Sequence, residues 1–187
     1  MGEIKFRIAN IEVTGEVIII DDSSIKDRKG KDKVQSQRDI ILNCCCELLD
    51  RIDLVISRDK NGAPFFEDAA LPFISISHSN NWFALQLSEK DRVGVDIQVL
   101  KSDIEKGMRY FVNEKEEKAL EINSLNLNII WAAKEAVYKY KKGNLEFYKE
   151  AMTVLSIDSD SLLVEVGDEH VKCVYLLQED FVLVYID

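Results

Sequence analysis

The hydrophobic positions of this chain change their spacing several times, and each change predicts an element. Residues 4–20 are rich in β-branched side chains around a central Thr-Gly pair, which predicts two paired strands. Residues 21–33 are polar and highly charged, which predicts a loop. Apolar side chains between residues 34 and 49 recur at helical spacing, which predicts a helix with one buried face.

Shorter apolar segments in the rest of the chain predict strands. One is expected at residues 54–57, followed by a turn at Asn61-Gly62 and Pro64. Residues 73–77 alternate apolar and small polar side chains, and the polar residues after them interrupt this pattern. The other predicted strands cover residues 82–87, 93–100, 152–157, 161–166, 171–177 and 181–186.

Two helices are predicted between these strands. Asn113 followed by Glu116 matches a capping box and predicts a helix that ends near residues 121–124. A second helix is expected at residues 127–142, where Gly143 stops it.

The order of elements is therefore strands, helix, strands, helices and strands. This order favours an α+β fold with antiparallel sheets over alternating βαβ units. A length of 187 residues fits one large domain or two small lobes. The pattern suggests a division near residue 90, into an N-terminal lobe of residues 1–90 and a C-terminal lobe of residues 91–187.

Composition and charge exclude several classes of function. The net charge is −10, from 24 basic and 34 acidic side chains, which argues against non-specific nucleic-acid binding and against docking on an anionic membrane. The four cysteines include no C-x-x-C pair, so they do not suggest a structural zinc site. The chain starts without a signal-peptide core and has no apolar run near the ~20 residues of a membrane span. We therefore expect a cytoplasmic protein.

Three local clusters carry residues that are capable of chemistry, and each also has an ordinary structural interpretation. Hydroxyls and one imidazole at 75–79 could hold phosphate oxygens, although a lone histidine is often structural and no G-x-S-x-G elbow supports a serine nucleophile. The segment 94–98 is either a solvated edge strand or a row of oxygen ligands for a hard cation. On the helix at 131–139, Glu135 and Lys139 could form a surface pair worth only ~0.3–0.5 kcal/mol.

Together, the order and spacing of the clusters are more specific. Ser77-His78-Ser79, then Gly94-Val-Asp96-Ile-Gln98, then Trp131-x-x-Lys134-Glu135-Ala-x-x-Lys139 resembles the signature of the 4′-phosphopantetheinyl transferases. The chain looks like the surfactin-synthetase-activating type, whose single chain is a pseudo-dimer of two similar α+β lobes. The motifs cover roughly residues 60–143, and the rest of the chain agrees by length and element order.

The resemblance implies a Mg²⁺-dependent enzyme and a role for each matched residue. Asp96 and Glu135 would bind the Mg²⁺, while Gln98 stands where many family members carry a third acid and would ligate more weakly. Lys134 and Lys139 would approach the phosphates of coenzyme A, and His78 with Ser77 beside it would contact a phosphate.

The nucleotide of coenzyme A would lie on the N-terminal lobe. The family's Gly-Lys-Pro segment corresponds to Gly62-Ala63-Pro64, which lacks the lysine. Pro64 remains as a nucleotide contact. The candidates for binding the 3′-phosphate are Arg28, Lys31, Lys33 and Arg38, with Arg38 favoured.

The implied reaction moves phosphopantetheine from coenzyme A to a serine of an apo acyl or peptidyl carrier protein and releases 3′,5′-ADP. Glu135 would take the serine proton, directly or through a bound water, and Lys139 would assist the leaving group. The resemblance also implies a monomer. Three alternatives remain: a coenzyme A-binding relative with weak or no activity, a non-catalytic interaction module, and an unrelated Mg²⁺-dependent phosphate-ester enzyme.

Overall fold

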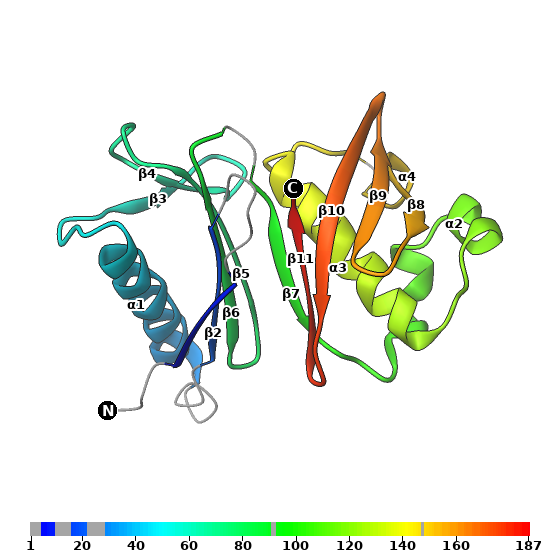
Figure 1. Ribbon diagram of the computed structural model, residues 1–187, viewed down its shortest axis with the longest axis horizontal. Coiled ribbons are helices and arrows are strands. Elements are labelled where there is room, and N and C mark those ends of the chain that lie inside the picture. The colour runs from blue at the N-terminus through cyan, green and yellow to red at the C-terminus, as the bar shows by residue number, and fades with distance from the viewer. Residues whose placement is uncertain (1–4, 10–15, 22–28, 91–92, 147) are drawn as a thin grey trace.

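Two antiparallel sheets pack face to face, and each carries a helix on its outer face (Figure 1). The computed structural model describes residues 5–9, 16–21, 29–90, 93–146 and 148–187. The predicted α+β class with antiparallel sheets is confirmed. Within the described ranges, every helix is too short or too polar to span a bilayer.

The first sheet has the strand order β1-β2-β6-β5 and is covered by helix α1. Alternate residues of its inner strands, among them Ile18 and Ile20, meet the apolar face of α1, where Ile40, Ile41 and Cys45 are buried. A separate hairpin, β3 with β4, lies beside this sheet. The bounds are β1 Lys5–Ala9, β2 Glu16–Asp21, α1 Gly30–Leu48, β3 Ile56–Arg58, β4 Pro64–Phe66, β5 Phe73–Ser79 and β6 Trp82–Ser88.

Two details of this first half differ from the sequence prediction. Helix α1 begins at Gly30, so Lys31 and Lys33 lie in its first turns rather than in a loop. The charge run is compatible with a helix because Asp32 complements the positive helix end and the Ser36 hydroxyl bonds the Asp32 carbonyl. The predicted turn is present at Asn61-Gly62, but Pro64, which was expected to belong to it, is the first residue of β4, a strand position that proline tolerates.

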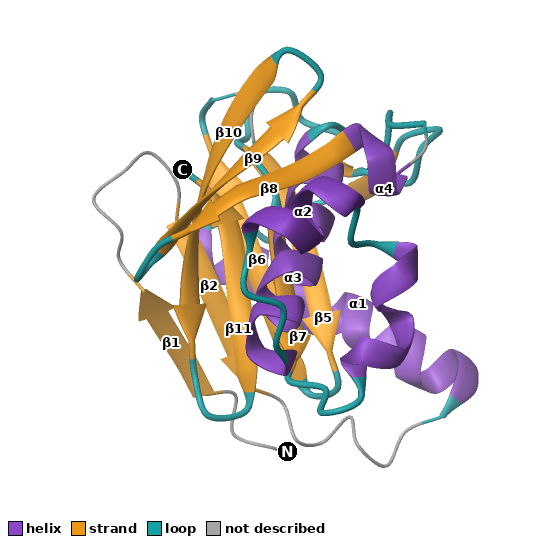
Figure 2. Cartoon of the chain, turned by 90° about the vertical axis from the view of Figure 1, so that its right-hand side faces the viewer, coloured by secondary structure: helices purple, strands orange, loops and turns teal. Residues whose placement is uncertain are grey.

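The second sheet has the order β7-β11-β10-β9-β8, and α3 lies across its outer face (Figure 2). Residues Val182, Val184 and Ile186 of β11 pack against the buried face of α3, which includes Ala133 and Val137. The bounds are β7 Val95–Val99, η2 Ile104–Tyr110, α2 Glu114–Ala119, α3 Ser124–Tyr140, α4 Tyr148–Ala151, β8 Met152–Ile157, β9 Ser161–Val166, β10 Glu169–Leu177 and β11 Phe181–Ile186.

The helix boundaries in this half follow their capping residues. The predicted capping box at the start of α2 is confirmed, because the Asn113 side chain accepts from the Glu116 N–H and the Glu116 carboxylate accepts from the Asn113 N–H. Helix α3 begins at Ser124, earlier than predicted, because the Asn123 side chain caps it. The 3₁₀ helix η2 and the short helix α4 were not predicted.

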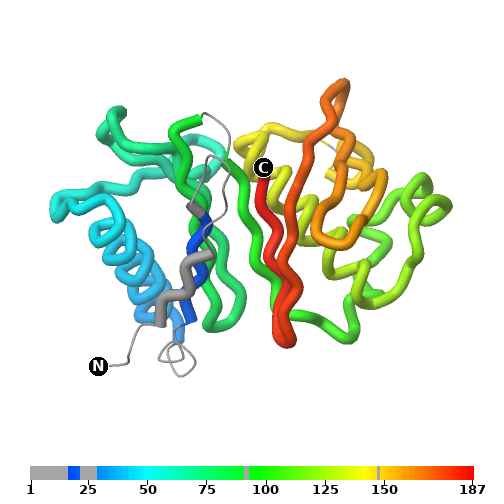
Figure 3. Tube along the Cα trace, in the orientation of Figure 1, coloured from blue at the N-terminus to red at the C-terminus, as the bar shows by residue number. Residues whose placement is uncertain are grey.

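The two sheets are joined by side chains where β5 and β7 run side by side (Figure 3). The hydroxyls of Ser75 and Ser79 each accept a hydrogen bond from a backbone N–H 20 residues further on, at distances of 3.1 Å. The buried Gln86 side chain of β6 adds a second bridge, since it accepts from the Gly94 N–H at 2.8 Å and donates to the Ile186 carbonyl at 2.8 Å. Serine and glutamine side chains thus replace a continuous backbone ladder between the sheets.

Helix α3 lies in close contact with the backbone at Gly94. A Cβ atom placed there would lie 2.3 Å from the Ala136 carbonyl oxygen and 2.9 Å from the Tyr140 Cβ. The absence of a side chain at residue 94 therefore allows α3 to rest directly against the start of β7. This contact sets how closely Glu135 and Lys139 of α3 lie to Asp96 of β7.

We predict that Gly94→Ala lowers the free energy of unfolding by about 1–3 kcal/mol, because the added methyl group must displace the backbone of α3. Urea denaturation measures this change. Gly107→Ala is the matched control, since a Cβ there meets nothing within 4 Å and its effect should stay within about 0.5 kcal/mol. Equal effects of the two substitutions would contradict the close contact.

Candidate functional site

Asp96 lies at a junction of three elements. Its Oδ1 accepts a hydrogen bond from the Ser77 hydroxyl of β5 at 2.7 Å and pairs with the Lys139 ammonium of α3 at 2.7 Å. The lysine also donates to the Val95 carbonyl at 2.9 Å. The Asp96 side chain is 8% exposed and that of Lys139 is 26% exposed, so this pair is largely shielded from solvent. Val95 and Ile97 fill the layer between the sheets, and alternation along β7 therefore turns Asp96 toward α3.

Glu135 stands one helical turn before Lys139 and is half-buried. Burial raises the pKa of the Glu135 carboxyl, and the Asp96 carboxylate raises it further. The Tyr148 hydroxyl and the Lys139 ammonium act in the opposite direction. In the described part of the chain Lys139 makes its ion pair with Asp96, in place of the surface pair with Glu135 that helix spacing allows. The site therefore combines two coupled carboxylates with a single lysine.

The oxygen donors of this junction suit a hard divalent cation. Gln98 follows Asp96 on the same face of β7 and is buried, with its Nε2 donating to the Val99 carbonyl at 2.9 Å. The described residues contain no group of three His, Cys, Asp or Glu side chains that could hold a metal ion. Two carboxylates and one amide nevertheless match Mg²⁺, which keeps several waters and is usually completed by substrate phosphates. The repulsion that raises the pKa of Glu135 is one that such a cation would relieve.

His78 marks a positively charged region at the end of β5. Its outer edge is exposed, while its inner side stacks on Phe83 with ring centroids 6.0 Å apart. Burial lowers the pKa of His78, the charges of Lys139, Lys33 and Arg58 lower it further, and the Asp96 carboxylate acts in the opposite direction. His78 is thus exposed enough for a ligand to reach its imidazole, although contact with Phe83 on one side partly desolvates the ring and lowers its pKa. Several cations around an accessible imidazole favour an anionic ligand.

Lys134 does not belong to this group. Its side chain and that of Glu116 are both 0% exposed, and the Lys134 Nζ lies 2.8 Å from the Glu116 Oε2. The ammonium also donates to the Phe111 carbonyl at 2.6 Å. Desolvation lowers the pKa of Lys134, and the Glu116 carboxylate opposes that shift. The helix thus directs its two adjacent charged residues to different places, Lys134 into the core and Glu135 toward β7.

The basic residues predicted on the N-terminal side are only partly brought to the site. Lys33 lies near enough to influence His78, whereas Lys31 and Arg38 are exposed on α1 and do not line the cavity described below. Arg28 lies outside the described residues. Arg58, which sequence reasoning missed, also influences His78 and donates to the Gly62 carbonyl at 2.7 Å.

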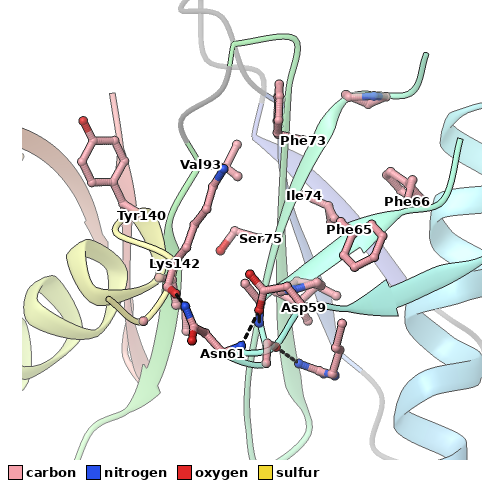
Figure 4. A pocket seen from close by; sticks show the side chains of 18 of the residues that line it. Asp59, Asn61, Phe65, Phe66, Phe73, Ile74, Ser75, Val93, Tyr140 and Lys142 are labelled. Atoms are coloured by element: carbon pink, nitrogen blue, oxygen red, sulfur yellow. Dashed lines mark hydrogen bonds between the residues drawn. The ribbon is translucent and has the colours of Figure 1, made fainter. Parts of the chain in front are cut away.

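A cavity of about 630 Å³ opens beside Glu135 and Lys139. Figure 4 shows Lys142, Val93 and Tyr140 on one side of it, and the β3–β4 hairpin on the other, with Ser75 between them. The Asn61 side chain ties the two sides together by donating to the Lys142 carbonyl at 3.0 Å. The lining of the cavity is largely apolar. It includes the predicted Pro64 and also Phe65, Phe66, Phe73, Ile74 and Tyr138. Such a volume accommodates a drug-sized or cofactor-sized ligand.

Comparison with known proteins identifies one family. A family model described as 4′-phosphopantetheinyl transferase superfamily matches residues 92–186, just over half of the chain. The match contains β7 with Asp96 and α3 with Glu135 and Lys139. No curated protein matches the chain.

We predict that Lys134→Met lowers the free energy of unfolding by about 3–5 kcal/mol, because it leaves the Glu116 carboxylate buried without its counter-charge. Chemical denaturation gives the value. Lys118→Met is the matched control, since Lys118 forms an exposed pair with Glu114 at 3.6 Å and its loss should cost less than about 1 kcal/mol. A Lys134→Met protein as stable as the control would show that Lys134 is not a structural residue.

Proposed function

The chain belongs to the 4′-phosphopantetheinyl transferase superfamily, and from this premise we propose that it modifies an apo acyl or peptidyl carrier protein. It transfers the 4′-phosphopantetheine group of coenzyme A to a serine of that carrier and releases 3′,5′-ADP. The observation that carries the proposal is the junction of Asp96, Lys139 and Glu135 beside a cavity, within the segment that the family model matches.

Coenzyme A is assigned to the cavity and to the positively charged region next to it. Its pyrophosphate lies near Lys139 and His78, where the cations that lower the pKa of His78 also favour phosphate. The nucleotide extends toward Pro64 and the first turns of α1. Lys33 and Arg58 are the best-supported partners for the remaining phosphate, and Lys31 and Arg38 stay as candidates on the same exposed side.

The metal of this proposal is Mg²⁺. Asp96 and Glu135 would hold it, and the Gln98 amide oxygen would add a neutral ligand or bind one of its waters. When bound, the ion supplies positive charge that orients and neutralises the pyrophosphate. Ser77 contributes by fixing the Asp96 carboxylate through its hydrogen bond of 2.7 Å.

The chemistry assigned to the side chains is a single displacement at phosphorus. The carrier serine oxygen forms a bond to the β-phosphorus of coenzyme A, and the bond from that phosphorus to the bridging oxygen breaks. Glu135 accepts the serine proton, directly or through a bound water. Lys139 offsets the negative charge that the leaving 3′,5′-ADP acquires on the bridging oxygen.

The same proposal includes a monomer built as a pseudo-dimer of two α+β lobes, divided near residue 90. Each sheet has its own helix and its own buried cluster, which supports two lobes. The sheets meet through an apolar layer and through serine and glutamine side chains, and they form two separate backbone ladders. A site between lobes leaves room for a carrier protein to bring its serine to the cavity.

Transfer is tested by incubating the purified protein with coenzyme A, MgCl₂ and a panel of apo carrier proteins, and measuring intact carrier mass. We expect a gain of one phosphopantetheine that is lost in EDTA. Asp96→Asn and Glu135→Gln should each reduce the rate by about 100-fold or more, because each removes a carboxylate assigned to hold the Mg²⁺, and the second also removes the proton acceptor. Glu117→Gln, an exposed position on α2, is the matched control and should keep the wild-type rate.

The other outcomes separate the alternatives. Binding of coenzyme A without transfer would identify a weakened relative, in which Gln98→Glu should restore activity if the metal site is the defect. Turnover of phosphate esters that lack a pantetheine arm would identify a different Mg²⁺-dependent enzyme. A protein that neither binds coenzyme A nor transfers phosphopantetheine would overturn the proposed function.

A further inference from the structure

The Tyr148 hydroxyl is buried and lacks a hydrogen-bond partner in the described part of the chain. A buried polar group left without a partner destabilises the folded state, so its presence requires an explanation. Burial raises the pKa of this hydroxyl, and the charge of Glu135 raises it further. Tyr148 is the first residue of the short helix α4, and the reaction described above assigns it no part.

The surroundings of Tyr148 direct its ring toward Glu135. The ring packs against Trp131 and Tyr138, with centroid separations of 6.1 and 5.7 Å. These two aromatic residues flank Glu135 on one face of α3, one turn to either side. The hydroxyl therefore lies close enough to Glu135 to lower its pKa, although no hydrogen bond of good geometry joins them.

We propose that Tyr148 is a positioning residue for Glu135, and that its hydroxyl donates a hydrogen bond to one carboxylate oxygen once substrate and metal are bound. The inference rests on the proposed function, which gives Glu135 its role. A glutamate side chain has three rotatable bonds, whereas the Tyr148 ring is held between two aromatic neighbours. A hydrogen bond from this fixed ring would select one rotamer of Glu135 and leave its second oxygen for the cation or the serine proton.

A purely structural role for Tyr148 gives different expectations. If only the ring matters, removal of the hydroxyl should leave every functional property unchanged. Tyr148→Phe isolates the hydroxyl because it keeps the aromatic packing. Tyr175→Phe is the matched control, since it also removes one hydroxyl, which donates to the carbonyl of Asp158 in the β8–β9 turn at 2.7 Å.

The test measures Mn²⁺ binding by calorimetry with coenzyme A present and no carrier, together with kcat and KM for coenzyme A. Tyr148→Phe should weaken Mn²⁺ binding and lower kcat by about 10- to 100-fold each, with an unchanged or raised melting temperature. Tyr175→Phe should leave Mn²⁺ affinity and kcat as in the wild type. In a Glu135→Gln background, Tyr148→Phe should have no further effect on either quantity, because the hydroxyl acts through Glu135.

Each result bears on one proposal or on both. An active wild type whose Tyr148→Phe variant keeps its Mn²⁺ affinity and kcat within twofold would overturn the positioning role alone. Equal losses of Mn²⁺ affinity and kcat from Tyr148→Phe in the Glu135→Gln background would also overturn the positioning role, because the hydroxyl would then act independently of Glu135. A wild type that neither binds Mn²⁺ nor transfers would overturn the positioning role together with the proposed function.

Discussion

The ion pair between Lys139 and Asp96 is the contact on which the geometry of the candidate site depends. It connects α3 to β7, and through the Ser77 hydroxyl it reaches β5 in the other sheet. A partly buried pair of this kind adds little to the free energy of unfolding, because the cost of desolvating the two charges offsets their attraction. Its importance is geometric. The hydrogen bond between Ser77 and Asp96 therefore belongs both to the joint between the two sheets and to the charged group beside the cavity.

This geometry depends on residues with no chemical role. Gly94 lets α3 approach β7, and Gln86 holds the start of that strand against the first sheet. Lys134 and Glu116 anchor α3 from the opposite side, in a pair with no exposure to solvent. Glu135 and Lys139 are therefore carried on a helix that is fixed at several points, as a site that positions phosphate groups requires. The unpartnered Tyr148 hydroxyl and the repulsion between Glu135 and Asp96 are local departures from good packing, and such departures concentrate at functional sites.

Periodicity and capping predicted most of the strands and helices, because β-branched alternation and the Asn113 capping box are local signals. They failed where a local signal has two interpretations. Lys31 and Lys33 were assigned to a loop but lie in the first turns of α1, and Pro64 indicated a turn but opens β4. Within the site, the family resemblance grouped Lys134 with Lys139, although five residues of helix turn their side chains about 140° apart. Arg58 and Tyr148 were missed because only the tertiary fold brings them near His78 and Glu135.

A crystal structure with coenzyme A and Mn²⁺ would test the central claim most directly, namely that the joint between the sheets is also the reaction centre. Anomalous scattering from manganese locates the metal independently of the surrounding density. We expect a single strong peak bound by the Asp96 and Glu135 carboxylates, with the pyrophosphate of coenzyme A against Lys139. Coenzyme A or manganese bound elsewhere, with the Lys139–Asp96 junction in contact with neither, would contradict the account.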